Sequence, residues 1–228
     1  MGEVYEAEHQ ETGRHVALKL LRGRIDRTED RARFLREGQL AASISDPHTV
    51  YVFGSEEIDG LPVIAMQLVP GGTLKDRVAE RGPLTVPEAV AVVLDVISGL
   101  DAAASAGILH RDIKPSNCFV DADGSVKVGD FGLSIPTGGR GADGTFMGTP
   151  QFASPEQLRG DALDVRSDIY AVGATLHYLL TGAPPFEDKD FTTLIERVRH
   201  EPPPLIHRGR AGVPAALGAL IARCLAKD

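Results

Sequence analysis

The chain has 228 residues, of which 43% are hydrophobic and 25% charged, and a formal net charge of −8. These values are typical of a folded domain and exclude a disordered or collagen-like chain, and no apolar stretch approaches the roughly 20 residues that a membrane helix needs. The acidic balance argues against nucleic acid as a partner, and Cys118 and Cys224 lie too far apart in sequence to indicate a disulfide framework or a zinc site.

Residues 4 to 68 are predicted to form mostly strands. Four apolar runs bounded by turn residues predict two hairpins, 4–7 with 15–21 and 51–55 with 61–68. The second hairpin has the strong turn signal Asp59-Gly60 between its strands. Between the hairpins, Thr28 is predicted to cap a helix that continues past Phe34 at helical spacing.

After Pro70-Gly71-Gly72, a natural hinge, the chain becomes mainly helical. Three longer helices are predicted: one opened by Pro87 and ended by Gly107, one over 165–180 capped by Asp164, and one opened by Pro214. The first is expected to bury a stripe of larger residues, namely Val90, Val93, Leu94, Ile97 and Leu100. The third is expected to do the same with Leu217, Leu220, Ile221, Cys224 and Leu225. Two short strands, 118–120 and 126–128, are predicted between the first two helices, and a cleft is expected between the two halves.

The strongest chemical signal is the run His110-Arg111-Asp112-Ile113-Lys114-Pro115-Ser116-Asn117. Its carboxylate can accept a hydroxyl proton, its ammonium can neutralise phosphate charge, and its amide oxygen can ligate a hard cation. Asp130-Phe131-Gly132 follows 18 residues after Asp112, directly beyond a predicted strand, where a carboxylate is well placed to hold Mg²⁺.

Upstream, Lys19 ends an otherwise apolar strand. A buried ammonium without a partner is costly, so an anionic group must lie near it. Glu37 on the predicted helix is the natural candidate, and bound phosphates are the second. The alternative is a lysine on an edge strand that points into water.

Together these motifs resemble the catalytic domain of eukaryotic-like protein kinases, and most of all bacterial serine/threonine kinases. The resemblance implies an α+β, two-lobed fold, with a small antiparallel-sheet N-lobe carrying one helix (1–68) and a larger helical C-lobe (69–228). It covers nearly the whole chain as a single domain. It starts at the third glycine of the nucleotide loop and stops before the family's last helix, so we expect a domain truncated at both ends.

The resemblance also assigns residues to ATP and Mg²⁺. Lys19, paired with Glu37, would hold the phosphates, and Met66 matches the gatekeeper. Nucleotide-binding positions implied in this way are Gly2, Val4, Ala17, Lys19, Met66, Gln67, Leu68, Val69, Phe119 and Asp130. Magnesium would be held by Asn117 and Asp130.

For catalysis, the resemblance implies that Asp112 is the base, that Lys114 contacts the γ-phosphate, and that Thr149 contacts both. Lys114 and Thr149 favour serine or threonine over tyrosine as the acceptor. Thr145 is the first candidate for an activating phosphosite, because its phosphate could pair with Arg111, and the alternative is a solvated loop residue. Two weaker phosphosite candidates are Ser134 and Thr137. Asp168 matches an aspartate that braces the catalytic loop.

The sequence therefore predicts an ATP-dependent protein serine/threonine kinase that acts on protein substrates and is activated by phosphorylation. Its expected location is the cytoplasm, either as a free protein or as the cytosolic domain of a membrane-anchored protein. The main alternative is a nucleotide-binding pseudokinase that serves as a scaffold. A small-molecule phosphotransferase would not need the docking segment 148–156, and a Walker-type ATPase is excluded because the chain has no such glycine-rich loop. The protein substrate, the upstream signal and the oligomeric state are left open.

Overall fold

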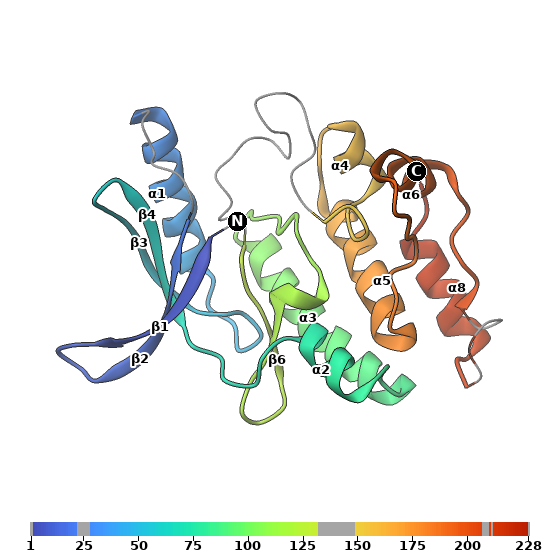
Figure 1. Ribbon diagram of the computed structural model, residues 1–228, viewed down its shortest axis with the longest axis horizontal. Coiled ribbons are helices and arrows are strands. Elements are labelled where there is room, and N and C mark those ends of the chain that lie inside the picture. The colour runs from blue at the N-terminus through green and yellow to red at the C-terminus, as the bar shows by residue number, and fades with distance from the viewer. Residues whose placement is uncertain (1, 22–27, 132–148, 207–209, 211, 228) are drawn as a thin grey trace.

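The computed structural model describes residues 2–21, 28–131, 149–206, 210 and 212–227. Two parts lie side by side, a sheet with one helix and a larger group of helices, and a short hairpin lies between them (Figure 1). The predicted α+β organisation is therefore confirmed.

The strands are β1 (Glu3–His9), β2 (Arg14–Leu20), β3 (Val52–Ile58), β4 (Leu61–Gln67), β5 (Cys118–Val120) and β6 (Val126–Val128). The helices are α1 (Thr28–Ser43), α2 (Leu74–Arg81), α3 (Val86–Ser105), α4 (Pro155–Arg159), α5 (Val165–Thr181), α6 (Phe191–His200) and α8 (Ala215–Cys224), with a 3-10 turn η1 (Pro115–Asn117). Sequence patterns did not predict α2, α4 or α6. Each is short and buries two residues, too few to produce a recognisable stripe.

The larger sheet is antiparallel, in the order β1-β2-β4-β3. Both predicted hairpins are present, and the turn between β3 and β4 has positive φ at Asp59 and Gly60, as the Asp-Gly signal requires. The register places Ala17 opposite Met66, and Val4 opposite Lys19. The sheet thereby gathers several of the residues that were assigned to nucleotide binding.

Helix α1 packs on β3 through a close contact at Gly38. A glycine inside a helix costs about 1 kcal/mol relative to alanine. Here a Cβ atom on residue 38 would lie 2.0 Å from Oγ of Ser55 and 2.5 Å from its Cβ. Because real Cβ atoms do not approach so closely, the glycine allows α1 to lie directly on the sheet.

We expect Gly38→Ala to lower the free energy of unfolding by about 1–3 kcal/mol, the usual cost of overpacking. Combining it with Ser55→Gly removes both clashing atoms, so the double variant should be more stable than the sum of the single effects predicts. Urea denaturation of the four proteins measures this coupling. Strict additivity would show that the contact with Ser55 does not determine the choice of glycine.

The predicted buried stripe of α3 is confirmed at Val93 and in part at Leu100, which packs against the core, but it is wrong at Leu94 and Ile97. Leu94 is 60% exposed and Ile97 is 46% exposed. The buried face instead consists of smaller residues, Ala89, Val92, Val93, Val96, Gly99 and Ala103. A Cβ on Gly99 would lie 2.4 Å from the carbonyl oxygen of His48, so close packing with the chain after α1 selects the small face.

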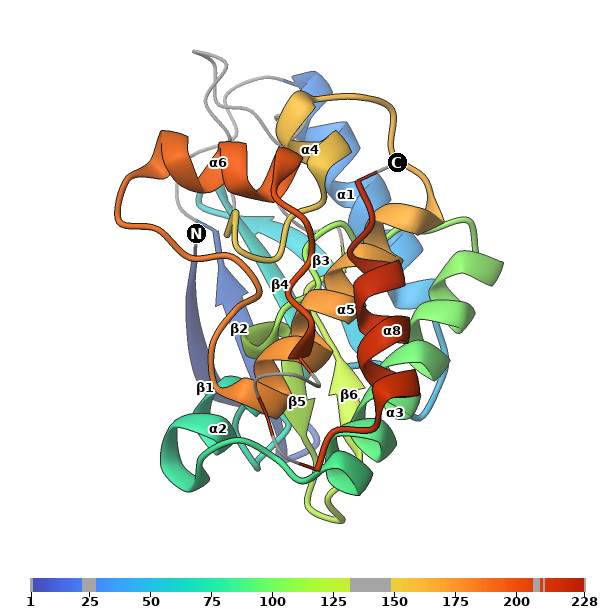
Figure 2. The same ribbon diagram turned by 90° about the vertical axis from the view of Figure 1, so that its right-hand side faces the viewer.

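The helical part is built around α5, which lies between α3 and α8 (Figure 1). Asp164 caps α5 by accepting from the N–H of Arg166, and most α5 side chains are buried, as predicted. In α8, Ile221 is buried, but the predicted core residue Leu220 is exposed. Helices α4 and α6 lie at one end of this part and α2 at the other (Figure 2). Every helix in the described residues is too short or too polar to cross a lipid bilayer.

Hydrogen bonds to the β5–β6 hairpin join the two parts. The N–H of Val128 donates to the oxygen of His48, and the N–H of Val50 donates back to the oxygen of Val128. On the other strand, the N–H of Gly71 donates to the oxygen of Val120, where a Cβ on residue 71 would collide at 2.4 Å. The residues after α1 and the predicted hinge are thus both attached to the hairpin that leads to Asp130. Fully buried Cys118 lies in this hairpin, and burial raises the pKa of its thiol to about 12, which fits a core residue.

Candidate active site

The loop between α3 and η1 is fixed by hydrogen bonds from its backbone to the side chain of Asp168 in α5. This carboxylate is 5% exposed, and it accepts from the N–H of His110 at 2.9 Å and from the N–H of Arg111 at 2.8 Å. The predicted bracing contact is therefore confirmed. Without it, two backbone donors in or near the core would lack partners.

Two residues of the site have positive φ angles, which residues other than glycine rarely adopt. Arg111 has φ +67° and Asp130 has φ +66°. Such conformations persist only where the surrounding structure imposes them, and they are concentrated at functional sites. Among the described residues other than glycine, positive φ occurs one residue before Asp112, at the aspartate of the Asp-Phe-Gly motif and at Asp59 in the β3–β4 turn.

His110 links these two places. Its Nε2 lies 2.8 Å from the oxygen of Gly129, and its ring packs on Phe131 with 4.8 Å between centroids, as the sequence predicted. Since a carbonyl only accepts, Nε2 must carry the proton. Nδ1 is then an acceptor, and it receives the N–H of Asp112 at 3.2 Å. The neutral ring thereby fixes Asp112 relative to the Asp-Phe-Gly motif.

The Asp112 carboxylate is surrounded by donors on one side. Lys114 Nζ lies 2.7 Å from Oδ2, and Asn117 Nδ2 lies 3.0 Å from the same oxygen. Lys114 Nζ also lies 3.2 Å from Oγ1 of Thr149. Because both donors meet Oδ2, Oδ1 is the oxygen with capacity left to accept a hydroxyl proton. The structure thus brings together the predicted residues Asp112, Lys114, Asn117 and Thr149.

Lys19 forms its ion pair with Asp130, whose Oδ2 lies 2.7 Å from Nζ. Glu37, the expected partner, lies half-buried on α1, next to Gly38, and its pairing with Lys19 stays a prediction. Asp130 follows β6, and its positive φ accompanies a side chain that meets β2. The tertiary arrangement therefore offers Lys19 a carboxylate that sequence reasoning assigned to the nucleotide and the metal but not to an ion pair with this lysine.

The oxygens of Asn117 and Asp130 fit a hard divalent cation. The Asn117 amide directs Nδ2 to the backbone oxygen and to the carboxylate of Asp112, and Oδ1 accepts no hydrogen bond from the described residues. The N–H of Gly129 donates to the oxygen of Asn117, which places Asp130 one residue from that contact. No cluster of three or more His, Cys, Asp or Glu suited to a metal occurs in the described part. Two protein oxygens match Mg²⁺, which usually takes its other ligands from phosphates and water.

The remaining nucleotide-binding predictions lie along the sheet and the connection after it. Ala17 and Met66 are buried neighbours, and Val4 is exposed opposite Lys19. A Cβ on Gly2 would lie 2.1 Å from the oxygen of Leu20, so close approach requires a glycine there. At the end of β4, the N–H of Gln67 donates to the carbonyl oxygen of Tyr51. Leu68 and Val69 follow and are half-buried. Phe119 forms a β-bridge with Thr73. The phosphosite candidates Ser134, Thr137 and Thr145 lie outside the described residues.

One residue of this site was missed. Gln157 in α4 donates through Nε2 to the oxygen of Arg111 at 2.7 Å. A possible sequence signal was the capping box formed by Ser154 and Gln157, which marks the start of a helix. The pattern does not reveal that the same amide also reaches the catalytic loop.

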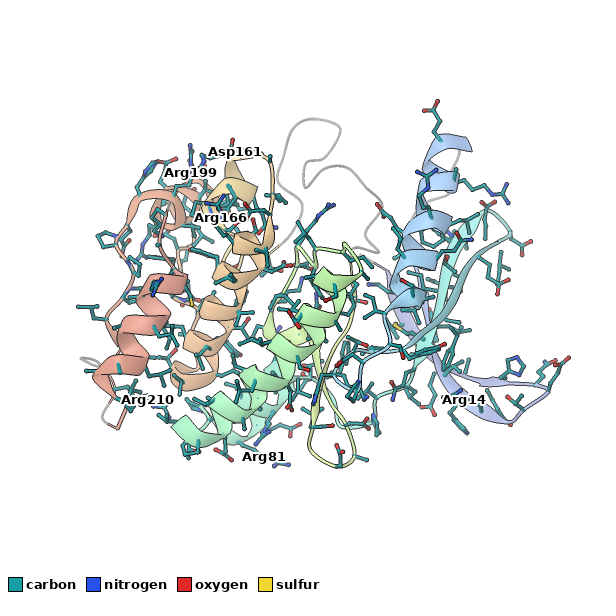
Figure 3. All side chains as sticks on the ribbon, turned by 180° about the vertical axis from the view of Figure 1, so that it is seen from behind. Arg14, Arg81, Asp161, Arg166, Arg199 and Arg210 are labelled. Carbon is teal, nitrogen blue, oxygen red and sulfur yellow. The ribbon has the colours of Figure 1, made fainter. Side chains whose placement is uncertain are left out.

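The arginines marked in Figure 3 are spread over the periphery. Arg14 lies at the sheet end of the molecule, Arg81 and Arg210 along one edge of the helical part, and Arg166 and Arg199 at the opposite edge. These five side chains do not form a common basic face.

Known proteins and a protein family match this chain over its whole length. The family described as "Protein kinase domain" matches residues 1–228. Serine/threonine-protein kinase PknH of Mycobacterium bovis is 38% identical over 230 residues, and PknB of Mycobacterium tuberculosis is 39% identical over 238 residues. Both matches cover 100% of this chain but only 39% and 38% of those proteins, so the chain spans about two fifths of their length. The structure of a cysteine-to-alanine mutant of the Mycobacterium tuberculosis PknI kinase domain has a TM-score of 0.78 at 31% identity, covering 100% of this chain and 83% of that one.

Proposed function

The chain belongs to the protein kinase family, its named relatives are serine/threonine kinases, and on that basis we propose which of its residues carry out phosphoryl transfer. The observation that supports the proposal most is Lys114, whose ammonium lies between the Asp112 carboxylate and the Thr149 hydroxyl. The substrate is ATP together with a serine or threonine hydroxyl of a protein.

Asp112 positions the acceptor hydroxyl and receives its proton at Oδ1. The hydroxyl oxygen forms a bond to the γ-phosphorus, the bond from that phosphorus to the β-phosphate oxygen breaks, and ADP leaves. Lys114 and Lys19 stabilise the negative charge of the transferring group, because fixed cations in a partly buried site need little reorganisation.

Asn117 and Asp130 would hold the Mg²⁺ ion, which neutralises phosphate charge when bound. The ion pair between Asp130 and Lys19 supports this role, because it holds the proposed metal ligand beside the proposed phosphate-binding lysine. Glu37 is proposed to support Lys19 from α1 on the family resemblance alone. On the same basis, the other residues proposed to bind the nucleotide are Gly2, Val4, Ala17, Met66, Gln67, Val69 and Phe119.

Regulation by phosphorylation of Thr145 is a further part of the proposal. A phosphate there would carry nearly two negative charges and could pair with the exposed Arg111. Since the chain spans only about two fifths of its curated relatives, the substrates, the partners and the cytoplasmic location of the whole protein are proposals as well.

The test is transfer from γ-labelled ATP to the protein itself and to myelin basic protein, with and without Mg²⁺. We expect labelled phosphoserine or phosphothreonine, and we expect the label to disappear when EDTA removes the metal. Thermal stabilisation by ATP without any transfer would instead support the scaffold alternative. Label on tyrosine would contradict the proposed acceptor.

A further inference from the structure

Gln157 uses the two ends of its amide for two different tasks. Oε1 accepts from the N–H of Ser154 at 2.9 Å, and together with the Ser154 hydroxyl this contact closes the capping box of α4. Nε2 donates to the oxygen of Arg111 at 2.7 Å, 46 residues away in sequence. Capping alone does not require the second contact, because a glutamate at residue 157 would close the same box.

The second contact falls on the peptide group that precedes the Asp112 Cα. The oxygen of this Arg111–Asp112 peptide accepts from Gln157, and its N–H donates to Nδ1 of His110. Both polar atoms of one peptide plane are therefore held by side chains. The N–H of Arg111 itself is held by Asp168.

These contacts surround a residue in an unfavourable backbone conformation, Arg111 at φ +67°. A peptide plane next to such a residue can relax by rotating, and rotation would turn the following Cα and its side chain. Gln157 opposes this rotation from α4, the helix that follows the segment containing Thr149.

We propose that Gln157 is a positioning residue that orients the Asp112 carboxylate by fixing the Arg111–Asp112 peptide, so that the segment from Thr149 to Gln157 is coupled to the catalytic loop. The proposal rests on the proposed role of Asp112 as the base. It concerns kcat more than nucleotide binding, because none of these contacts involves a residue assigned to ATP.

The two ends of the amide can be separated by substitution. Gln157→Glu keeps the acceptor for Ser154 but replaces the donor by a negative oxygen facing a carbonyl. Gln157→Lys keeps a donor within reach of Arg111 but removes the acceptor. Ser154→Ala weakens the cap without touching the catalytic loop.

We expect Gln157→Glu to lower kcat about three- to tenfold, which is the size of one lost hydrogen bond, while its melting temperature and its KM for ATP stay near those of the unaltered protein. Gln157→Lys and Ser154→Ala should melt at lower temperature and keep kcat. The assay is transfer to myelin basic protein with ATP and Mg²⁺. As the pH falls from 8 towards 5, the protonated fraction of the added carboxyl group rises but stays a minority, since the ordinary pKa of glutamic acid is about 4.3. Because the protonated form can donate again, the ratio of the Gln157→Glu rate to the unaltered rate should rise modestly.

A kcat that falls equally in Gln157→Glu and Gln157→Lys, or that follows melting temperature across all three variants, would overturn the proposal and leave Gln157 a capping residue only. The failure of the underlying assignment looks different. If Asp112→Asn retained full transfer, Asp112 would not be the base. If Asp112→Asn were inactive and Gln157→Glu matched the unaltered protein, only the positioning role would be refuted.

Discussion

Replacing Asp112 by asparagine is expected to lower kcat by about 10²–10⁴-fold, the usual contribution of a general base. The asparagine side chain has nearly the same shape but cannot accept the hydroxyl proton. It would also present an amide where Lys114 and Asn117 now direct their donors to one oxygen. The KM for ATP should change less than kcat, because Asp112 contacts only two of the residues assigned to ATP and its metal, Lys114 and Asn117.

Initial rates of label transfer from ATP to myelin basic protein measure this effect. Asp101→Asn is the matched control, since it makes the same chemical change at an exposed position of α3. That control should transfer at the normal rate. Equal rates for the Asp112 and Asp101 variants would remove Asp112 from the mechanism.

The second large effect is expected on folding. Asp168→Ala should lower the free energy of unfolding by about 2–6 kcal/mol, because each of two backbone N–H groups loses its partner at a cost of about 1–3 kcal/mol. Transfer activity should fall as well, since the same bonds hold His110 and Arg111 in place.

Asp164→Ala provides the comparison within the same helix. Asp164 also accepts a hydrogen bond from a backbone N–H, at the start of α5, but Asp164 is exposed. Its loss should therefore lower the free energy of unfolding less than the loss of Asp168 does, and it should leave kcat unchanged. Urea denaturation gives both stabilities. If the two variants lost equal stability and neither lost activity, the bracing role of Asp168 would be contradicted.

Much of the fold could be predicted because its signals are local. The Asp59-Gly60 turn, the capping aspartate Asp164 and the first-turn prolines act through backbone preferences of a few residues. The catalytic loop was identified in the same way, since Asp112, Lys114 and Asn117 lie within six residues and their contacts are made inside that span.

The wrong or missing predictions share a different origin. The buried face of α3 depended on which neighbour packs against it, and the close approach of His48 selected Gly99 over Leu94. The ion-pair partner of Lys19 depended on how a hairpin more than 100 residues later meets β2. In both cases the stabilising contact is made by atoms that are distant in sequence, so no local sequence pattern predicts which residue is buried or which carboxylate is near Lys19.

The sequence by itself determined the strands, the longer helices, the kinase motifs and the candidates for the chemically active groups, because residue type and short-range spacing decide these. Only the tertiary structure decided which oxygen of Asp112 is left to act, which carboxylate meets Lys19, and that Gln157 reaches Arg111. The physical reason is that hydrogen bonds and ion pairs act over about 3 Å, and folding alone brings such distant groups within that range.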